Sequence, residues 1–334
     1  MDHDGVTLRR AVRLTGIAVL IAVSALVCAL AVGPTHVNLS EVLALNHQSL
    51  DYQKVVDYRL PRALAAAITG AALALGGVTF QVLVRNPLAS PFVLGVSSGG
   101  SLGAALALSL GATFVGPWAF LGCLGAVVIV FLAGRRHGKL SSTSLLLAGV
   151  ITNATLSAVI TFINLVAAPS DRDRILRWLV GGLPESLDSS SLLLSAASVL
   201  VFLTHLLLRS RELNLMAVSD EMAARGCISV NRLRIEFFVT GSALTAAAVT
   251  LAGPIPFVGL VVPHLTRLAI GPDHRLTVPV AAFGGAAFVM LADMAAQSLW
   301  REPLPAGVLT AAIGGPLFLI MLRNLDRERA GLDG

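Results

Sequence analysis

The chain has 334 residues, of which 55% are hydrophobic and 13% are charged, and its mean hydropathy is +0.81. Soluble domains contain about 25% charged residues, so this composition excludes an ordinary soluble protein and predicts a chain that crosses a membrane many times. The net charge of +5 needs no nucleic acid to explain it, because cytoplasmic loops of membrane proteins retain lysine and arginine.

In chain order, the uncharged run 14–39 predicts the first spanning helix and 63–84 predicts the second, since about 20 apolar residues cross a bilayer. The first run follows basic residues but lacks a small-residue cleavage site, so we expect a retained helix and not a signal peptide. The run 86–134 predicts two helices, because glycine and proline at 111–117 favour a tight reversal. The run 140–170 predicts the fifth helix.

The second half of the chain predicts five more helices. Residues from about 186 to 208 form the sixth. The run 237–264 is broken at Gly253–Pro256, which predicts a helix, a bent external turn and a shorter helix that ends near Ile270. Two last runs complete a count of about ten: 276–300 and 303–322.

The expected fold is therefore an all-α polytopic membrane protein with a single transmembrane domain over residues 1–334. Lysine and arginine set its orientation, because cytoplasmic loops retain positive charge. With both termini cytoplasmic, 17 of these residues fall inside, and the others lie outside: Lys54, Arg59, Arg62, Arg172, Arg174, Arg177 and Arg301. All three tryptophans then lie near external helix ends, where amphipathic rings favour the interface: Trp118, Trp178 and Trp300.

A glycine repeat at four-residue spacing predicts close helix packing on one helix face: Gly95, Gly99 and Gly103. The functional alternative for the same helix is a polar path lined by hydroxyl groups: Ser97, Ser98 and Ser101. The motif GxxxxGK[ST] does not occur in the chain. We therefore expect no phosphate-cradling loop and no ATP hydrolysis by the chain itself.

Two other groups of charges call for an explanation. Residues 171–178 place Arg174 three residues after Asp171 and Arg177 four residues after Asp173, which predicts a short external surface helix, either merely solvated or used for gating or docking. Asp293 lies inside the ninth span, where an acid is costly and is a functional candidate. The alternative is a buried, ion-paired acid that locks helices together.

We expect neither a metal site nor a disulfide framework. The three cysteines are far apart and show no CxxC spacing: Cys28, Cys123 and Cys227. His264 has no second histidine, cysteine or carboxylate three or four residues further on, as a helical metal site would need.

The polar segment 209–234 carries eight acidic and basic residues between apolar runs, which indicates a contact with a soluble partner. A short helix fits its middle, with a cap, acids in the first turn, a base in the last turn and a terminating glycine: Ser219, Asp220, Glu221, Arg225 and Gly226. Three apolar residues at helical spacing would bind a groove on that partner: Leu215, Val218 and Met222. The alternative is an ordered connecting loop.

Motifs from about residue 59 to 322 occur in a recognisable order: RLPRALAAAITGAALALGG, VRNPLASPFVLGVSSGGSLGA, STSLLLAGV, LNLMAVSDEMAARG, AGPIPFVGLVVPHLTRLAIGPDHR, LADMAAQ and LPAGVLTAAIGGPLFLIML. By these motifs the chain resembles the permease subunits of type II ABC importers, the FecCD-like group that takes up iron(III)-siderophores, haem and cobalamin. The resemblance covers nearly the whole chain, apart from roughly the first 55 residues.

The resemblance implies three functional surfaces. The segment from Leu213 to Gly226 would dock in a cleft of an ABC ATPase. External arginines would meet acidic residues on the two lobes of a substrate-binding protein: Arg59, Arg62 and Arg301. A cytoplasmic gate would be formed by the turn after the second helix and the start of the fifth: Asn86, Leu88, Thr143 and Ser144.

It also implies alternating access in a permease dimer, formed with a second copy or a related chain in the bacterial cytoplasmic membrane. A cytoplasmic ATPase dimer would use ATP and Mg, and an extracytoplasmic binding protein would deliver the substrate. No cofactor is expected on this chain itself. Iron(III)-siderophore is the expected substrate, because it is the commonest in the resembling group, with haem or cobalamin as alternatives.

The rival class is a secondary transporter in which Asp293 couples an ion gradient to transport. Such carriers often contain inverted repeats with paired broken helices, and no clear internal repeat is visible here. A polar docking segment would also have no purpose in such a carrier. A membrane structural or sensor protein would need a soluble domain that the predicted elements do not include.

Overall fold

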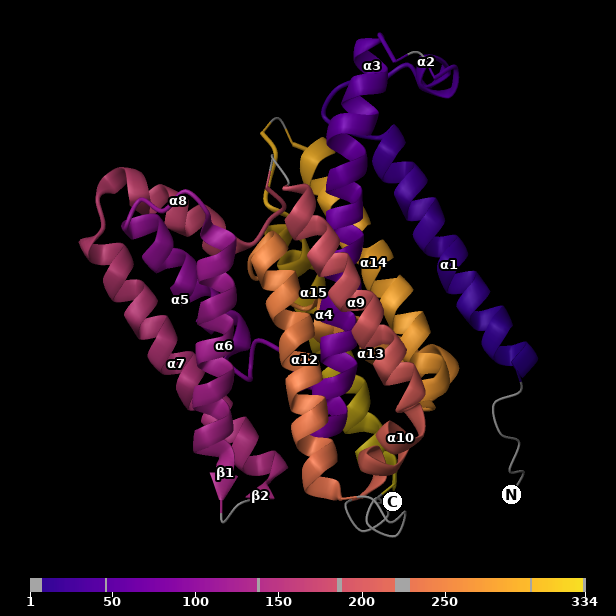
Figure 1. Ribbon diagram of the computed structural model, residues 1–334. Coiled ribbons are helices and arrows are strands. Elements are labelled where there is room, and N and C mark those ends of the chain that lie inside the picture. The colour runs from indigo at the N-terminus through magenta and orange to yellow at the C-terminus, as the bar shows by residue number, and fades with distance from the viewer. Residues whose placement is uncertain are drawn as a thin grey trace.

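The computed structural model describes residues 8–45, 47–136, 139–184, 188–219, 229–300 and 302–332, and this described part is almost entirely helical (Figure 1). Its first half contains α1 (Leu8–Ala31), α2 (Leu39–Leu43), α3 (Leu50–Gln53), the π-helix η1 (Lys54–Arg59), α4 (Leu60–Val84), α5 (Val96–Ser109), α6 (Val115–Gly134) and α7 (Ser142–Val166). Its second half contains α8 (Pro169–Val180), α9 (Ser189–Leu208), α10 (Ser210–Val218), α12 (Val230–Ala252), α13 (Val258–Ile270), α14 (His274–Ser298) and α15 (Ala306–Leu332). Between α6 and α7, β1 (Arg135–Arg136) pairs with β2 (Lys139–Leu140). The predicted all-α class is confirmed.

Helix α4 forms the centre of the molecule and is buried along most of its length. It packs against α12, α14 and α13, and its alanine- and glycine-rich sequence allows these backbones to come close. A Cβ atom on Gly70 would lie 2.1 Å from the carbonyl oxygen of Gly285, and one on Gly77 would lie 1.8 Å from that of Gly259. Because lipid tails are apolar, the hydrophobic effect does not drive helices together inside a membrane, and close packing between small residues stabilises the bundle instead.

Seven helices in the described chain are long and apolar enough to cross a membrane. Three shorter apolar helices bring the spans to the predicted count of about ten. These are α5 with 14 residues, α13 with 13, and the apolar first part of α15, Ala306–Met321. The irregular segments before α5 and α13 contain glycine with positive φ, Gly95 and Gly253, which explains why both helices begin late.

Two helix boundaries differ from the predicted ones. The first helix was expected at 14–39 but ends at Ala31, because Gly33 and Pro34 follow and proline disfavours a helical residue before it. The second was expected to begin at residue 63, but the structure is helical from Leu50 onward through α3, η1 and α4. The sequence prediction counted uncharged residues only, and so it missed the charged helical extension that precedes the apolar run.

The predicted surface helix near residues 171–178 is confirmed as α8, and Asp171 lies 3.8 Å from Arg174. The described side chains of Asp173 and Arg177 form no ion pair, so the second expected pairing is wrong. Both residues have the helical spacing that an ion pair needs. An ion pair between exposed side chains contributes little free energy, however, so the spacing alone does not ensure that it forms.

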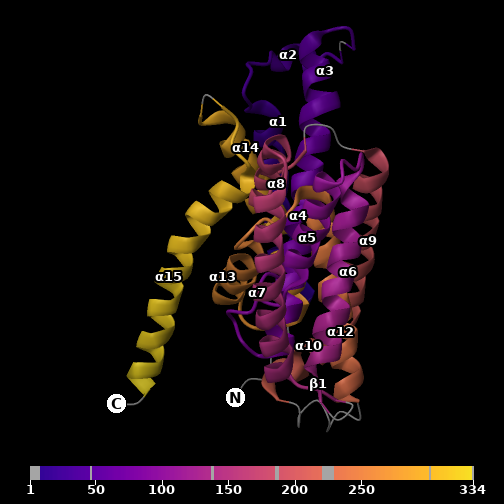
Figure 2. The ribbon, with the colours of Figure 1, turned by 90° about the vertical axis from the view of Figure 1, so that its left-hand side faces the viewer.

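The two ends of the described chain lie at the same end of the molecule as α10 and β1, whereas α2, α3 and α8 lie at the opposite end (Figures 1 and 2). We refer to these as the α10 end and the α8 end. Helix α15 leans away from the other helices toward the α10 end (Figure 2).

Candidate functional site

Hydroxyl and amide side chains from α5 and α7 line one cavity of about 310 Å³. Ser97, Ser98 and Ser101 are all buried, so the three serines predicted as a path lie together. Helix α7 contributes polar groups of the same kind: Asn153, Ser157 and Thr161. Among the described residues that line this cavity none is charged, so it offers hydrogen bonds without strong electrostatic attraction.

The hydroxyls differ in how they are bonded. The Ser98 hydroxyl lies within hydrogen-bond distance of Asn153 Oδ1 and of the Gly95 carbonyl oxygen. The Ser97 hydroxyl is buried, and no group in the described chain bonds to it. A buried hydroxyl without a partner loses the free energy of its hydrogen bonds with water, which a polar solute or water in the cavity would restore.

The glycine repeat positions α5 beside two different helices. A Cβ atom on Gly99 would lie 2.3 Å from the carbonyl oxygen of Gly122, and one on Gly103 would lie 2.0 Å from that of Trp118, both on α6. Gly95 instead precedes the helix with φ +77° and faces Gly149 of α7. The three glycines therefore do not form a single contact strip, because Gly95 is a helix cap and not a helical residue.

The two segments predicted to form the gate lie next to each other at the α10 end. Asn86 Oδ1 accepts a hydrogen bond of 2.9 Å from the backbone N–H of Leu88, which fixes the turn after α4. The hydroxyl of Ser142, at the start of α7, donates to the Leu83 carbonyl oxygen at 2.8 Å. Beside it, Thr143 is exposed and Ser144 is half-buried.

Part of the predicted docking segment forms α10, a helix that the sequence analysis did not anticipate. Leu213 and Met216 are buried in the core of the molecule, whereas Val218 is 64% exposed and Ser219 ends the helix. Leu213 was predicted to contact a partner; its burial is a correction, because a side chain inside the core does not reach a partner surface. Leu215 is half-buried and packs against the core. The other predicted docking residues lie outside the described residues: Asp220, Glu221, Met222, Arg225 and Gly226.

Helix α10 is bonded to the rest of the molecule along its whole length. At its start, Arg209 lies 3.1 Å from Glu212 and 3.0 Å from Glu236 of α12. The hydrogen bond to Glu212, followed by the charge of Glu236, raises the pKa of Arg209.

The middle and the end of α10 are held by two further sets of hydrogen bonds. Asn214 donates to Asp273 Oδ1 at 2.9 Å and accepts from the backbone N–H of His274 at 2.9 Å. Arg85, which follows α4, donates to the Met216 carbonyl oxygen at 2.9 Å. A movement of α10 would therefore be transmitted to α12, α14 and the turn after α4.

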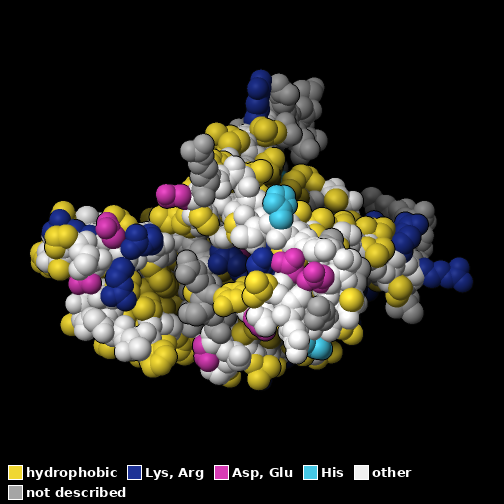
Figure 3. Space-filling view, turned by 90° about the horizontal axis from the view of Figure 1, so that it is seen from above, with side chains coloured by type: hydrophobic (Ala, Val, Ile, Leu, Met, Phe, Trp, Pro, Cys, Tyr) yellow, Lys and Arg dark blue, Asp and Glu magenta, His cyan; other side chains and the backbone are white. Residues whose placement is uncertain are grey.

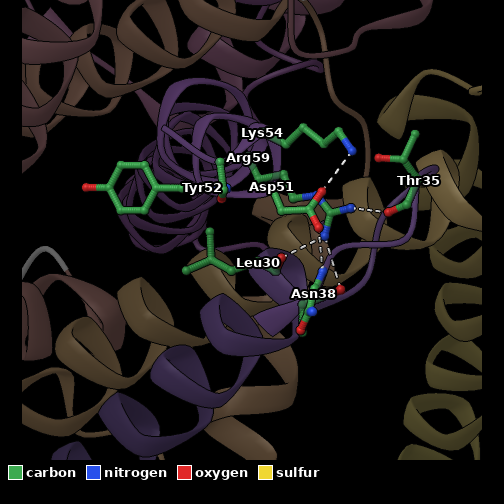
Figure 4. Close-up of polar contacts among 9 residues, drawn as sticks. Leu30, Thr35, Asn38, Asp51, Tyr52, Lys54 and Arg59 are labelled. Carbon is green, nitrogen blue, oxygen red and sulfur yellow. Dashed lines mark hydrogen bonds and ion pairs between the residues drawn. The ribbon is translucent and has the colours of Figure 1, made fainter. Parts of the chain in front are cut away.

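At the α8 end, the two described arginines predicted to meet a binding protein are bonded within the chain. The Arg59 guanidinium donates to the carbonyl oxygens of Leu30 at 2.7 Å and Ala31 at 3.0 Å, and to that of Thr35 (Figure 4). Unpaired carbonyl groups at a helix C-terminus attract a cation, so Arg59 ties the end of α1 to η1. Arg301, the third predicted arginine, lies outside the described residues.

Arg62 forms a two-pronged ion pair with Asp293. Its Nε and Nη2 atoms donate to the two carboxylate oxygens at 2.8 Å each, and the Asp293 side chain is 7% exposed. The pair joins α4 to α14, so the prediction of a buried, ion-paired Asp293 is confirmed. Together with Arg59 and Gln297 it lines a pocket of about 390 Å³.

The whole α8 end carries charges of both signs. Seen from above, lysine and arginine side chains lie beside aspartate and glutamate side chains near the middle of this face (Figure 3). Within the part of the chain that the structure describes, no group of three His, Cys, Asp or Glu residues is placed to hold a metal ion.

Comparison with known proteins agrees with this geometry. The chain matches the FecCD transport family over residues 19–324. It is 40% identical to the cobalamin import system permease of Halobacterium salinarum, over 81% of this chain and 73% of that protein. It is 37% identical to the hemin transport system permease of Yersinia pestis, over 83% and 85%, and 37% identical to the Fe(3+) dicitrate transport system permease of Escherichia coli, over 81% and 85%.

A solved structure of a metal-chelate-type ABC transporter in an inward-facing conformation is also similar. It has a TM-score of 0.82 and 30% sequence identity, and the match covers 93% of this chain and 98% of that one. The match therefore extends over nearly the whole chain.

Proposed function

The chain belongs to the FecCD transport family, the permease subunits of type II ABC importers, and on this premise we propose that it forms the membrane path of an ATP-driven importer of iron(III)-siderophore complexes. The observation that carries the proposal is the uncharged, hydroxyl-lined cavity between α5 and α7. A large chelate passing such a surface makes many weak contacts and no strong one, so it is released easily. The chain itself binds no cofactor in this proposal.

The proposed cycle is alternating access between two permease subunits, either two copies or this chain with a relative. A loaded extracytoplasmic binding protein delivers the chelate at the α8 end. ATP and Mg bind to the partner ATPases, whose closure moves the segment 219–226. The bonded helix α10 transmits that movement to the turn at Asn86 and Leu88, and the contact between Ser142 and Leu83 carries it to Thr143 and Ser144.

This cycle requires the α10 end to face the cytoplasm, with both termini on that side. The positive-inside rule supports the orientation, since 17 of the 24 lysine and arginine residues lie in segments assigned to the inside. The protein is thus proposed to be a multi-pass protein of the bacterial cytoplasmic membrane.

Docking of the binding protein is proposed at the pocket beside Arg59 and Arg62, with Arg301 as a third contact. Both described guanidiniums already have partners within the chain, so an acidic residue of the binding protein would share or displace those bonds. Such contacts govern the rate of association more than the final affinity.

Cobalamin and haem are the alternative substrates, favoured by the names of two relatives, from Halobacterium salinarum and Yersinia pestis. Growth of a strain lacking this gene on defined iron(III)-siderophores, on haem and in cobalamin-limited medium separates the three. We expect the strain to lose growth on a siderophore alone and to regain it with the intact gene. Loss confined to cobalamin or haem would overturn the siderophore assignment and leave the importer class intact.

A gradient-driven carrier is the rival from another class, with Asp293 as the coupling acid. The two-pronged bond to Arg62 argues against it, because the guanidinium already holds both carboxylate oxygens of Asp293. The bond supports a structural role in joining α4 and α14.

A further inference from the structure

A second cavity, of about 210 Å³, lies at the α10 end and is separate from the hydroxyl-lined path. Three segments meet there: the end of α4 with its following turn, the end of α10, and the α13–α14 turn. The residues used below are Gln81, Asn86, Ala217, Arg267 and His274, all of which line this cavity. From their chemistry we infer that the cavity binds a protonated phosphate group, either inorganic phosphate or a phosphate monoester. The inference does not depend on the proposed function.

His274 contributes a hydrogen-bond acceptor. It is 2% exposed, and its Nδ1 lies 2.7 Å from Asn214 Oδ1. That oxygen also accepts from the His274 backbone N–H, while Asn214 Nδ2 donates to Asp273. Because the network makes Oδ1 an acceptor, Nδ1 carries the proton. In the neutral ring Nε2 then carries a lone pair, and this atom is buried and bonded to nothing in the described chain.

Gln81 contributes a second acceptor. Its Nε2 donates to the carbonyl oxygens of Gly259 and Leu260 at 3.3 Å each, which orients the amide. Its Oε1 is then left buried, with no partner among the described residues. An amide oxygen in that condition loses hydrogen bonds it would have in water.

Arg267 contributes a donor and a positive charge. Its Nη2 is buried, and no described group bonds to it. A guanidinium stays protonated in proteins, and no carboxylate is among the described residues that line the cavity. The Arg267 residue is half-buried, and a partly buried cation without a counter-charge is unfavourable. An anion is therefore the ligand that would stabilise this charge.

Hydrogen phosphate matches the Arg267 guanidinium and one of the two acceptors at once. An ionised oxygen accepts from Arg267 Nη2, and the P–OH group donates to His274 Nε2 or to Gln81 Oε1. Sulfate and phosphodiesters have no O–H group at neutral pH and would set an oxygen against each acceptor. Water would satisfy the hydrogen bonds but not the charge. The site is therefore expected to prefer phosphate to sulfate.

The position of the cavity gives the ligand a structural consequence. Asn86 belongs to the turn after α4, and Ala217 belongs to the last turn of α10. A phosphate between them would brace these two segments against the α13–α14 turn. Its binding should raise the thermal stability of the folded chain, because any ligand specific for the folded state does so.

The test uses the full-length chain in phosphatidylcholine nanodiscs and phosphate-free buffer. Its melting temperature is measured against increasing phosphate, and against sulfate at equal ionic strength. We expect a saturable rise with phosphate and at least about fivefold weaker binding of sulfate, because sulfate has no O–H group and leaves the acceptor unsatisfied. No rise, or equal rises with both anions, would overturn the inference.

Two variants and a control sharpen the test. Arg267→Gln should lose the response, whereas Arg275→Gln, an exposed arginine just after the same turn, should keep it. His274→Asn can retain the bond to Asn214 but loses the Nε2 acceptor, so it should bind sulfate and phosphate more equally. If the His274→Asn variant still bound phosphate more tightly than sulfate by the same factor, the assigned role of Nε2 would be wrong. This result can be obtained even if Arg267→Gln fails to fold.

Two further experiments distinguish the groups that could occupy the cavity: inorganic phosphate, a lipid phosphate monoester, or the chain's own acidic side chains. Nanodiscs that contain phosphatidic acid should abolish the response to free phosphate if a lipid monoester is the source, and leave it intact if the source is inorganic phosphate. Either result supports the site. If phosphate acts only on an Asp220→Asn, Glu221→Gln variant, the chain's own acids fill the cavity in the wild type, and the inference is wrong.

Discussion

At the scale of single residues, Asp293 shows what an acid at membrane depth does in this fold. It accepts two hydrogen bonds of 2.8 Å from Arg62, and both residues line the pocket at the α8 end. Each charge lowers the cost of burying the other, and together they join α4 to α14. Loss of one partner would leave the other uncompensated.

We expect Asp293→Asn to lower the free energy of unfolding by about 2–4 kcal/mol, because it leaves the Arg62 guanidinium without a counter-charge. Thermal unfolding in detergent measures the change. Asp171→Asn is the control, since its pair with Arg174 is long and partly exposed to solvent and should contribute below about 1 kcal/mol. A stable Asp293→Asn variant whose transport loses its pH dependence would instead favour the ion-coupled carrier.

The sequence identified both partners of this pair but not the pair itself. Asp293 was recognisable as a charge inside an apolar run, and Arg62 by its place in the RLPR motif. They are 231 positions apart, and no local pattern in a single sequence connects residues at that separation. The bonds of Arg59 to the end of α1 were not predictable for a related reason. Every residue has a backbone carbonyl group, so the sequence does not show which one accepts a hydrogen bond.

At the scale of elements, the contact between α5 and α6 depends on the absence of side chains. Gly122 and Gly99 face each other, and a Cβ atom on Gly122 would lie 2.1 Å from the Gly99 carbonyl oxygen. Gly125, on the same helix, has nothing within 4 Å of its Cβ position. The two glycines thus offer a matched pair of substitutions.

Gly122→Ala should destabilise the fold by about 1–3 kcal/mol, because the helices must separate or strain to admit the methyl group. Gly125→Ala should be neutral or should stabilise by up to about 1 kcal/mol, since alanine favours a helix more than glycine does. Melting temperatures of the two variants provide the comparison. Equal destabilisation would show that the helices do not pack as described.

Helix α10 is one of the elements that the sequence analysis missed. Leu213 and Leu215 were predicted to belong to a partner surface, whereas Leu213 is buried in the core and Leu215 packs against it. Periodicity reveals an apolar helix face but not what covers it. The helix 258–270 was anticipated because Gly253–Pro256 marked its start, as proline and glycine act through local geometry.

Asn214→Leu should weaken the transmission of movement from α10 to α14. It removes the bonds to Asp273 and His274 and leaves a buried donor unpaired, at a cost of about 1–3 kcal/mol. In the assembled importer, stimulation of ATP hydrolysis by the loaded binding protein should fall severalfold. Thr204→Val is the control, because Thr204 is exposed and bonds only within its own helix. Unchanged stimulation in Asn214→Leu would show that α10 is not the connection.

At the scale of the whole molecule, composition and the positions of lysine and arginine were enough to predict an all-α membrane fold of about ten helices. The short spans α5 and α13 were recoverable because glycine and proline interrupt the apolar runs before them. How the helices surround α4 was not predictable, since every apolar helix face satisfies the same pattern. The close glycine contacts of α4 with α13 and α14 show why that arrangement is stable.

The proposed function also requires a partner ATPase. The residues proposed to dock it, Glu221 and Met222, lie outside the described residues. A double Glu221→Ala, Met222→Ala variant should retain the membrane fold and lose the coupling of ATP hydrolysis to transport. Melting temperature and ATPase stimulation are measured on the same preparation. Transport equal to the wild type would place the docking site elsewhere.

ATP-driven uptake is the central claim, and reconstitution tests it most directly. The permease is placed in liposomes with its ATPase and binding protein, and accumulation of an iron(III)-siderophore is measured with and without ATP and with and without an imposed ion gradient. We predict accumulation that requires ATP and the binding protein and is indifferent to the gradient. Accumulation driven by the gradient in the absence of ATP would contradict the account.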